Sequence, residues 1–132
     1  MAIIPLNPPE LPALTGVISH GVKLPDVGLV YTAGQVAWDA EGNVVGDDLA
    51  EQFRKAYENI DRVLEAGGTS RDKIVKETIF LPGYTTDQAE ALIGHLVEAR
   101  TGHPAPPAST AVGVESLYAD GFLVEIEVVA VI

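Results

Sequence analysis

The sequence predicts one α+β domain over residues 1–132, in which a mixed six-stranded sheet carries two helices on one face. Two segments, 48–66 and 86–100, place apolar residues at 3.6-residue spacing, which is typical of half-buried helices. Short apolar runs bounded by glycine and proline predict the strands. The resulting order, β-β-β-α-β-α-β-β, implies right-handed crossovers within one sheet.

The first third of the chain predicts an arm followed by short strands. Four prolines among residues 1–12 favour an extended arm. Three segments rich in branched apolar residues then predict strands: 17–23, 29–33 and a hairpin over 36–45. The four residues Asp39–Gly42 are the expected loop of that hairpin.

Each predicted helix has a start signal and a buried stripe. Asp48 and Glu51 have the spacing of a capping box at the first helix, and Gly67-Gly68 supplies its left-handed stop. Thr86 or Asp87 is expected to cap the second helix. The expected buried residues are Leu49, Phe53, Ala56, Ile60, Val63 and Leu64 in the first helix, and Ala89, Leu92, Ile93, Leu96 and Val97 in the second.

The remaining strands predict a sheet that needs a second covering layer. Residues 74–81 are largely apolar on both faces and predict a central strand, and the segments Pro104–Val114 and Val124–Ile132 hold the last two strands. Because both helices cover one face, apolar residues of the other face must be buried by another subunit. The hydrophobic content of 47% and the mean hydropathy of +0.21 agree with a homo-oligomer.

Composition excludes several classes of function. With no cysteine, the chain forms no disulfide, no thiolate nucleophile and no Cys-ligated metal site. The three histidines (His20, His95 and His103) lack the spacing of a metal pair, so no metal is expected. A net charge of −11 argues against nucleic acid as a partner. No apolar run approaches the roughly 20 residues that span a bilayer, and no signal peptide is evident, so we expect no membrane partner and a cytoplasmic location.

The last quarter of the chain holds the candidate chemistry, and it contains no Lys or Arg from Thr101 onward. Glu125 and Glu127 are two residues apart on a strand, so both point to the same face. Such a pair fits an exposed strand face or an ion pair at a subunit interface. Because the surrounding strand is apolar, desolvation is expected to raise the proton affinity of a carboxylate there, which suits it to hold or activate water.

Three further positions are candidates for contact with a ligand. Ser109 and Thr110 follow the rigid Pro104–Pro107 stretch and could serve as strand-start hydroxyls or as hydrogen-bonding groups for a ligand. A nucleophilic serine is not favoured, because no His–Asp partners are evident. Gly34 ends a strand where backbone can approach a ligand closely, although a lone glycine also serves a turn or a bulge.

Six motifs follow one another between about Ala13 and the end of the chain. They are Tyr31-Thr-Ala-Gly-Gln-Val36, Glu51-Gln-x-x-x-Ala56-x-x-Asn59-Ile60, Val63-Leu-Glu-Ala-Gly-Gly68, Val75-Lys-x-Thr-x-Phe-Leu81, Pro107-Ala-Ser-Thr110 and Val124-Glu-Ile-Glu-Val-Val-Ala-Val131. Together they resemble the Rid family, also called YjgF or reactive-intermediate deaminases. The resemblance implies a chorismate-mutase-like fold and a homotrimer with a central β-barrel, with small-molecule sites in the clefts between subunits. It further implies hydrolysis of reactive enamines and imines to keto acids and ammonia, without a metal or organic cofactor.

The resemblance carries over to some site positions and fails at others. Glu125 matches the glutamate that positions the attacking water, and Gly34 with Ala33 matches the backbone that lines the pocket. Ser109 stands where the active branch has an arginine that grips the substrate carboxylate, and Ile18 stands where a tyrosine is usual. The cysteine often found two residues after the arginine is Ala111. A cation of an adjoining subunit could compensate, the candidates being Lys23, Arg54, Lys76 and Arg100.

Two functions of different classes follow from these replacements. One is hydrolysis of a small neutral or weakly polar imine or enamine, with water oriented by Glu125 and with Ser109, Thr110 and the backbone at Gly34 as hydrogen-bonding groups. The substrate is then not a simple α-imino acid. The other is a non-catalytic trimer that binds a metabolite or a partner in the same clefts. Endoribonuclease activity, a label this family has carried, is disfavoured by the acidic charge.

Overall fold

The structure is a computed structural model that describes residues 1–103 and 105–132. Its α-helices and strands are β1 (Ile4–Leu6), β2 (Gly21–Leu24), β3 (Leu29–Thr32), α1 (Leu49–Ala66), β4 (Ile74–Pro82), α2 (Ala89–Ala99), β5 (Ala108–Val114) and β6 (Glu125–Val131). Two short 3-10 turns, η1 (Arg71–Lys73) and η2 (Thr86–Gln88), precede β4 and α2. Pro104, at the start of the proline stretch expected to be rigid, lies outside the described residues.

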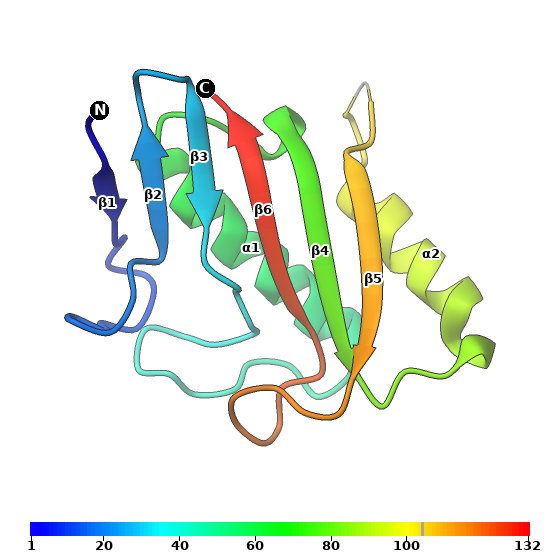
Figure 1. Cartoon of the computed structure of the whole chain (residues 1–132). Coiled ribbons are helices and arrows are strands. Elements are labelled where there is room, and N and C mark those ends of the chain that lie inside the picture. The colour runs from blue at the N-terminus through cyan, green and yellow to red at the C-terminus, as the bar shows by residue number, and fades with distance from the viewer. Residues whose placement is uncertain (104) are drawn as a thin grey trace.

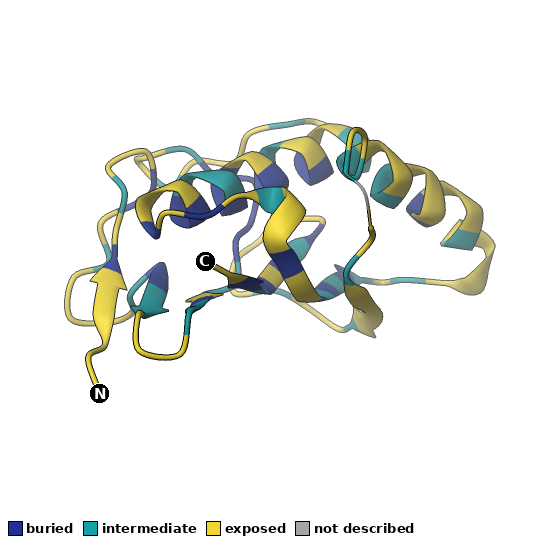
Figure 2. Ribbon diagram, turned by 90° about the horizontal axis from the view of Figure 1, so that it is seen from above, coloured by how far each residue is buried: buried dark blue, intermediate teal, exposed yellow. Residues whose placement is uncertain are grey.

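The six strands form one mixed sheet in the order β1-β2-β3-β6-β4-β5 (Figure 1). Every neighbouring pair is antiparallel except β4 and β5, which run parallel. Both α-helices lie on the same face of the sheet, as the side-by-side layers of Figure 2 show. The predicted fold class is therefore confirmed.

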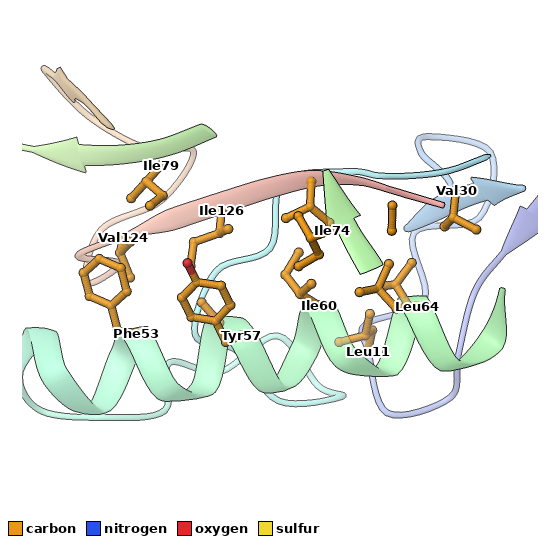
Figure 3. Close-up of a cluster of buried hydrophobic side chains, with 14 of the residues drawn as sticks. Leu11, Val30, Phe53, Tyr57, Ile60, Leu64, Ile74, Ile79, Val124 and Ile126 are labelled. Carbon is orange, nitrogen blue, oxygen red and sulfur yellow. The ribbon is translucent and has the colours of Figure 1, made fainter. Parts of the chain in front are cut away.

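The core lies between α1 and the sheet. Phe53, Ile60 and Leu64 point from α1 toward the strands, where they meet side chains such as Ile79 and Ile126 (Figure 3). Of the stripe predicted for α1, the members other than Leu49 are buried, and Leu49 is half-buried against the same cluster. The 3.6-residue spacing thus identified the buried face of this helix correctly.

The segment 36–45 turns back on itself at the predicted loop, but it adds no strand to the sheet, and the sixth strand comes from the arm instead. Within that segment, Trp38 and Val44 form an antiparallel bridge, and the amides of Asp39 and Val45 donate to the backbone oxygens of Asn43 at 3.0 Å and Ala37 at 2.7 Å. The Asn59 side-chain amide donates to the backbone oxygens of Val36 at 2.9 Å and Trp38 at 3.0 Å, which attaches this segment to α1. The arm supplies β1, an edge strand in which Pro5 needs no ladder partner for its nitrogen.

The strand predicted over 17–23 is shorter than expected. β2 begins at Gly21, because the amides of Val17 and Ile18 donate to the Leu14 oxygen and turn the chain before it. Ile18 therefore lies on a turn between the arm and β2.

The first helix starts at its predicted cap, whereas the cap before the second helix lies one residue earlier than predicted. Asp48 caps α1 as expected, with its Oδ1 accepting from the amide of Glu51 at 2.8 Å, whereas the Glu51 carboxylate accepts from Asp47 rather than from Asp48. The cap before α2 is Thr85, which forms a reciprocal box with Gln88 ahead of η2. Neither Thr86 nor Asp87 is the cap, because the chain turns into η2 one residue earlier.

The predicted buried stripe of α2 is only partly correct. Leu92 is buried and Leu96 packs against the core from a half-buried position, but Ile93 and Val97 are 61% and 65% exposed. α2 contacts α1 along one narrow edge, so the rest of its apolar surface remains in solvent within a single chain.

The face of the sheet opposite the helices carries exposed apolar side chains. Tyr31, Val112 and Val131 lie on it and are 43%, 39% and 38% exposed. This open face is where a second subunit is expected, and the homotrimer with its barrel stays a prediction. In the part of the chain that is described, no helix has the length and apolar character needed to cross a membrane.

Candidate active site at the start of β6

Glu125 opens β6 on the open face of the sheet. The burial pattern of this strand alternates, with Ile126, Val128 and Ala130 buried toward the helices and Glu127 exposed on the other side. The predicted common face of the two glutamates is therefore confirmed. Glu125 is half-buried, which distinguishes it from Glu127.

The Glu125 carboxylate lies directly against the backbone at Gly34. A Cβ built on Gly34 would stand 2.3 Å from Oε2 of Glu125, so only glycine leaves room for this carboxylate. Gly34 and Glu125 are held together because the residues that follow them, Gln35 and Ile126, exchange both backbone hydrogen bonds, at 2.8 and 3.0 Å. The Ala33 amide donates to the backbone oxygen of His20 at 2.8 Å. The structure thus brings Ala33, Gly34 and Glu125 together.

Burial raises the pKa of Glu125 above its ordinary value, and the like charge of Glu127 raises it further. This is the direction expected from desolvation of a carboxylate within an apolar strand. None of the ion pairs among residues 1–103 and 105–132 involves Glu125. A carboxylate of this kind can accept a proton from water and return it.

Ser109 and Thr110 lie on opposite faces of the edge strand β5. Thr110 is in register with Thr78, which is in register with Glu127, so Thr110 belongs to the open face. Ser109 is in register with the buried Glu77 and belongs to the helix side. Both are exposed, and within one chain only Thr110 shares the face of Glu125.

The four candidate cations have different surroundings. On the helix side of the sheet, Arg100 donates to the buried carboxylate of Glu77. Arg54 forms an exposed pair with Glu98. The Nζ of Lys76 lies on the open face and donates to Thr110 Oγ1 at 2.8 Å. Lys23, whose strand neighbour is the buried Val30, extends on the helix side toward Gly68.

Ile18 lines a hollow that does not include Glu125. This hollow, of about 630 Å³, lies between the arm and the turn before β2 and is also lined by Pro9, Leu14 and Ala40. The side chain of Ile18 is apolar and supplies no hydrogen bond in this hollow. Among the described residues, no group of three or more His, Asp or Glu side chains is arranged to hold a metal ion.

Sequence reasoning missed the polar side chains behind the Gly34 backbone. His20, Gln35 and Trp38 are almost fully buried and are hydrogen-bonded to one another. The signal available in the sequence was a polar residue, Gln35, between Gly34 and an apolar run. Its partners come from separate segments, which no local pattern identifies.

Substitution of Gly34 by alanine tests the contact with Glu125. The new methyl group must displace the carboxylate, which is the end of a flexible side chain, so we expect a large loss of kcat with little loss of thermal stability. Circular dichroism melting and steady-state turnover would measure the two effects. Gly28→Ala, at a remote turn of positive φ, is the control that should affect stability without affecting kcat. Unchanged kcat in Gly34→Ala would contradict the assigned contact.

Comparison with known proteins agrees with this geometry. The profile of the family described as endoribonuclease L-PSP matches residues 11–132. The protein mmf2, mitochondrial, of Schizosaccharomyces pombe is 33% identical over 131 residues, covering 98% of both chains. The 2-iminobutanoate/2-iminopropanoate deaminase of Salmonella typhimurium is 36% identical over 70 residues, covering 53% of each. Because one relative is named as mitochondrial, the expected cytoplasmic location stays a prediction.

Comparison of the fold with solved structures gives a match over nearly the full length of the chain. The crystal structure of YyfA from Yersinia pestis, described as a conserved Rid family protein of unknown function, superposes with a TM-score of 0.85 at 32% identity, covering 99% of this chain and all of that one. The sequence profile and the three-dimensional match therefore agree, and the chain belongs to the Rid (YjgF) family.

Proposed function

We propose that this protein hydrolyses a small imine or enamine that lacks an α-carboxylate, in clefts between the subunits of a homotrimer. The observation that carries the proposal is the Glu125 carboxylate, held half-buried against the Gly34 backbone with a raised pKa. The relative named as an iminobutanoate deaminase supports chemistry at a C=N bond. No metal or organic cofactor is required for this reaction.

In the proposed reaction, Glu125 accepts a proton from water as the water oxygen attacks the C=N carbon. The C–O bond forms, the π electron pair of C=N moves to nitrogen, and nitrogen takes up a proton from solvent, which the later release of the hydroxyl proton returns. The resulting carbinolamine then loses its amine: the C–N bond breaks, the hydroxyl proton is released and a carbonyl forms. Because its pKa is raised, Glu125 can hold the proton between these steps and donate it to the leaving nitrogen.

The surrounding charges favour a substrate without a carboxylate. An α-imino acid would bring its anion toward Glu125 and Glu127, while Ser109 offers no counter-charge. Within the chain, Arg100 is already bound to Glu77. Lys76 is bound to Thr110, which lies in register with Glu127 rather than with Glu125. A neutral or weakly polar imine avoids this repulsion.

The test compares two classes of imine generated in situ. α-Imino acids formed from several amino acids and carboxylate-free imines formed from simple amines should both be supplied, with carbonyl and ammonia formation measured above the spontaneous rate. We expect faster turnover of the carboxylate-free class. Equal or faster turnover of the α-imino acids would contradict the proposed substrate class.

Substitution of Ser109 by arginine should extend the activity to α-imino acids, with position 109 facing the substrate from the adjoining subunit, because within one chain it lies on the face opposite to Glu125. A charge-assisted bidentate pair with the substrate carboxylate contributes about 1.5–3 kcal/mol, so kcat/KM for these substrates should rise on the order of 10- to 100-fold. Ser109→Gln, of similar reach but without charge, is the matched control. Steady-state kinetics on both variants measure the effect, and an equal gain from glutamine would contradict a charge-based role.

The alternative of a non-catalytic trimer rests on the joint replacement of the arginine, tyrosine and cysteine positions by Ser109, Ile18 and Ala111. In that case, a metabolite should raise the melting temperature of the protein without being converted. Stabilisation without turnover of either imine class would favour binding over catalysis, and turnover would exclude it.

A further inference from the structure

A chain of three buried polar side chains lies directly behind the glycine that contacts Glu125. His20, Gln35 and Trp38 are 1%, 0% and 4% exposed. They join three segments: the end of the turn before β2, the residue after Gly34, and the stretch that follows it. The proposed hydrolysis assigns no role to any of them.

The indole of Trp38 fixes the direction of every hydrogen bond in this chain. An indole nitrogen can only donate, and Trp38 Nε1 donates to Gln35 Oε1 at 3.2 Å. The amide nitrogen of Gln35 therefore faces His20 Nδ1, at 3.0 Å, and Nδ1 must accept. The proton of a neutral His20 then resides on Nε2, which donates to the backbone oxygen of Pro12 at 2.7 Å.

Both backbone neighbours of Gly34 are attached to this network. Ala33 donates its amide to the backbone oxygen of His20. Gln35 exchanges backbone hydrogen bonds with Ile126, the residue after Glu125. The network therefore fixes the residues on both sides of Gly34 in the chain, while the Glu125 carboxylate packs against Gly34 itself.

Apolar packing alone would not give this segment a defined orientation. Trp38 also packs edge-on against Phe122, with ring centroids 6.1 Å apart, and against His20 at 5.9 Å. Such contacts fill volume, but they do not determine which way the side-chain amide of Gln35 is turned. Fully satisfied buried hydrogen bonds remove that freedom, because each alternative leaves a buried donor or acceptor without a partner.

We propose that His20, Gln35 and Trp38 form a positioning network that sets the Gly34 backbone against Glu125 and thereby fixes the carboxylate that accepts the proton of the attacking water. The three residues act through Gly34 and touch no reacting atom. The inference rests on the proposed function for its kinetic consequence, whereas its structural consequence, a defined environment for Glu125, exists without turnover.

The experiment compares His20→Leu with His20→Gln, each by two readouts. The oxygen and nitrogen of a glutamine amide can replace Nδ1 as acceptor and Nε2 as donor, whereas leucine can replace neither. The readouts are the pKa of Glu125, followed by NMR of carboxyl-labelled protein, and the separate values of kcat and KM. For His20→Leu we expect a lower pKa of Glu125, because a loosened segment admits water, and at least a 10-fold loss of kcat with KM nearly unchanged. His20→Gln should retain the pKa and most of kcat.

Two further variants keep the test decisive. Trp38→Phe removes the fixed donor and keeps an aromatic ring, so it should lower the pKa of Glu125 in the same direction by a smaller amount, even if His20→Leu fails to fold. Leu92→Ala, on α2, opens the core elsewhere and should leave the pKa of Glu125 unchanged.

An unchanged pKa and kcat in both His20→Leu and Trp38→Phe would overturn the proposal. The same shift in Leu92→Ala would also overturn it, because the effect would then be general loosening. If the unaltered protein hydrolyses no imine, the proposed function fails, but the pKa readout still decides whether the network positions Glu125.

Discussion

Replacement of Glu125 by glutamine is expected to reduce imine hydrolysis by about 10²- to 10⁴-fold, the usual contribution of a positioned general base. The amide has the same shape as the carboxylate and can still pack on Gly34, but it cannot accept a proton from water. The loss should therefore appear in kcat, while the circular dichroism spectrum and the oligomeric state stay those of the unaltered protein.

Glu127→Gln is the matched control for this variant. Glu127 lies on the same face, two residues along β6, but it is exposed, and the atoms nearest to a Cβ at Gly34 all belong to Glu125. Its removal should leave kcat within a few-fold of its original value. Full activity of Glu125→Gln, or an equal loss in Glu127→Gln, would remove Glu125 from the proposed mechanism.

The pH dependence gives an independent check on the same carboxylate. Because the pKa of Glu125 is raised, the basic form is lost as the pH falls through a value above that of an ordinary glutamate. The acid limb of kcat/KM should therefore lie above about pH 4.5. Glu127→Gln removes a like charge and should move this limb to lower pH, and a limb at or below the ordinary value in the unaltered protein would contradict the raised pKa.

Local periodicity was sufficient to predict the central elements of the fold. The stripe that includes Phe53 and Ile60 follows from a spacing of 3.6 residues, and the common face of Glu125 and Glu127 follows from a spacing of two. These properties depend only on neighbours along the chain. The spacing of the apolar residues also agrees with the packed structure, because these residues form the face that packs against the core.

Positions that depend on distant partners could not be predicted in this way. The segment 36–45 turns back on itself as predicted, but it is attached to α1 through Asn59 and adds no strand to the sheet. β1 forms because the proline-rich arm finds the free edge of β2. The opposite faces of Ser109 and Thr110 also required the register between β4 and β5, which is set by strands about thirty residues apart.

The candidate site was predictable only where the resemblance and the alternation of the strand agreed. Glu125 and Gly34 meet as the family pattern implies. A cation that replaces the missing arginine could not be identified from the sequence, because the partner of each basic side chain depends on the three-dimensional fold. Arg100, which looks free in the sequence, is bound to the buried Glu77.

Replacement of Glu77 by alanine is expected to lower the free energy of unfolding by about 3–5 kcal/mol, the usual effect of breaking a buried ion pair. Glu77 is 1% exposed, and its carboxylate accepts from the Tyr57 hydroxyl at 2.9 Å as well as from Arg100. The variant leaves the guanidinium of Arg100, whose side chain is 18% exposed, without its counter-charge. Urea unfolding at one fixed protein concentration would measure the difference.

The exposed Arg54–Glu98 pair, which joins α1 to α2, is the matched control. Its side chains are 59% and 50% exposed, so Glu98→Ala should cost less than about 1 kcal/mol. A double variant, Glu77→Leu with Arg100→Met, removes both buried charges and should recover much of the stability lost in Glu77→Ala, since neither charge is then left unpaired. If Glu77→Ala costs no more than Glu98→Ala, or the double variant is less stable than Glu77→Ala alone, the buried charges are not coupled as the contacts indicate.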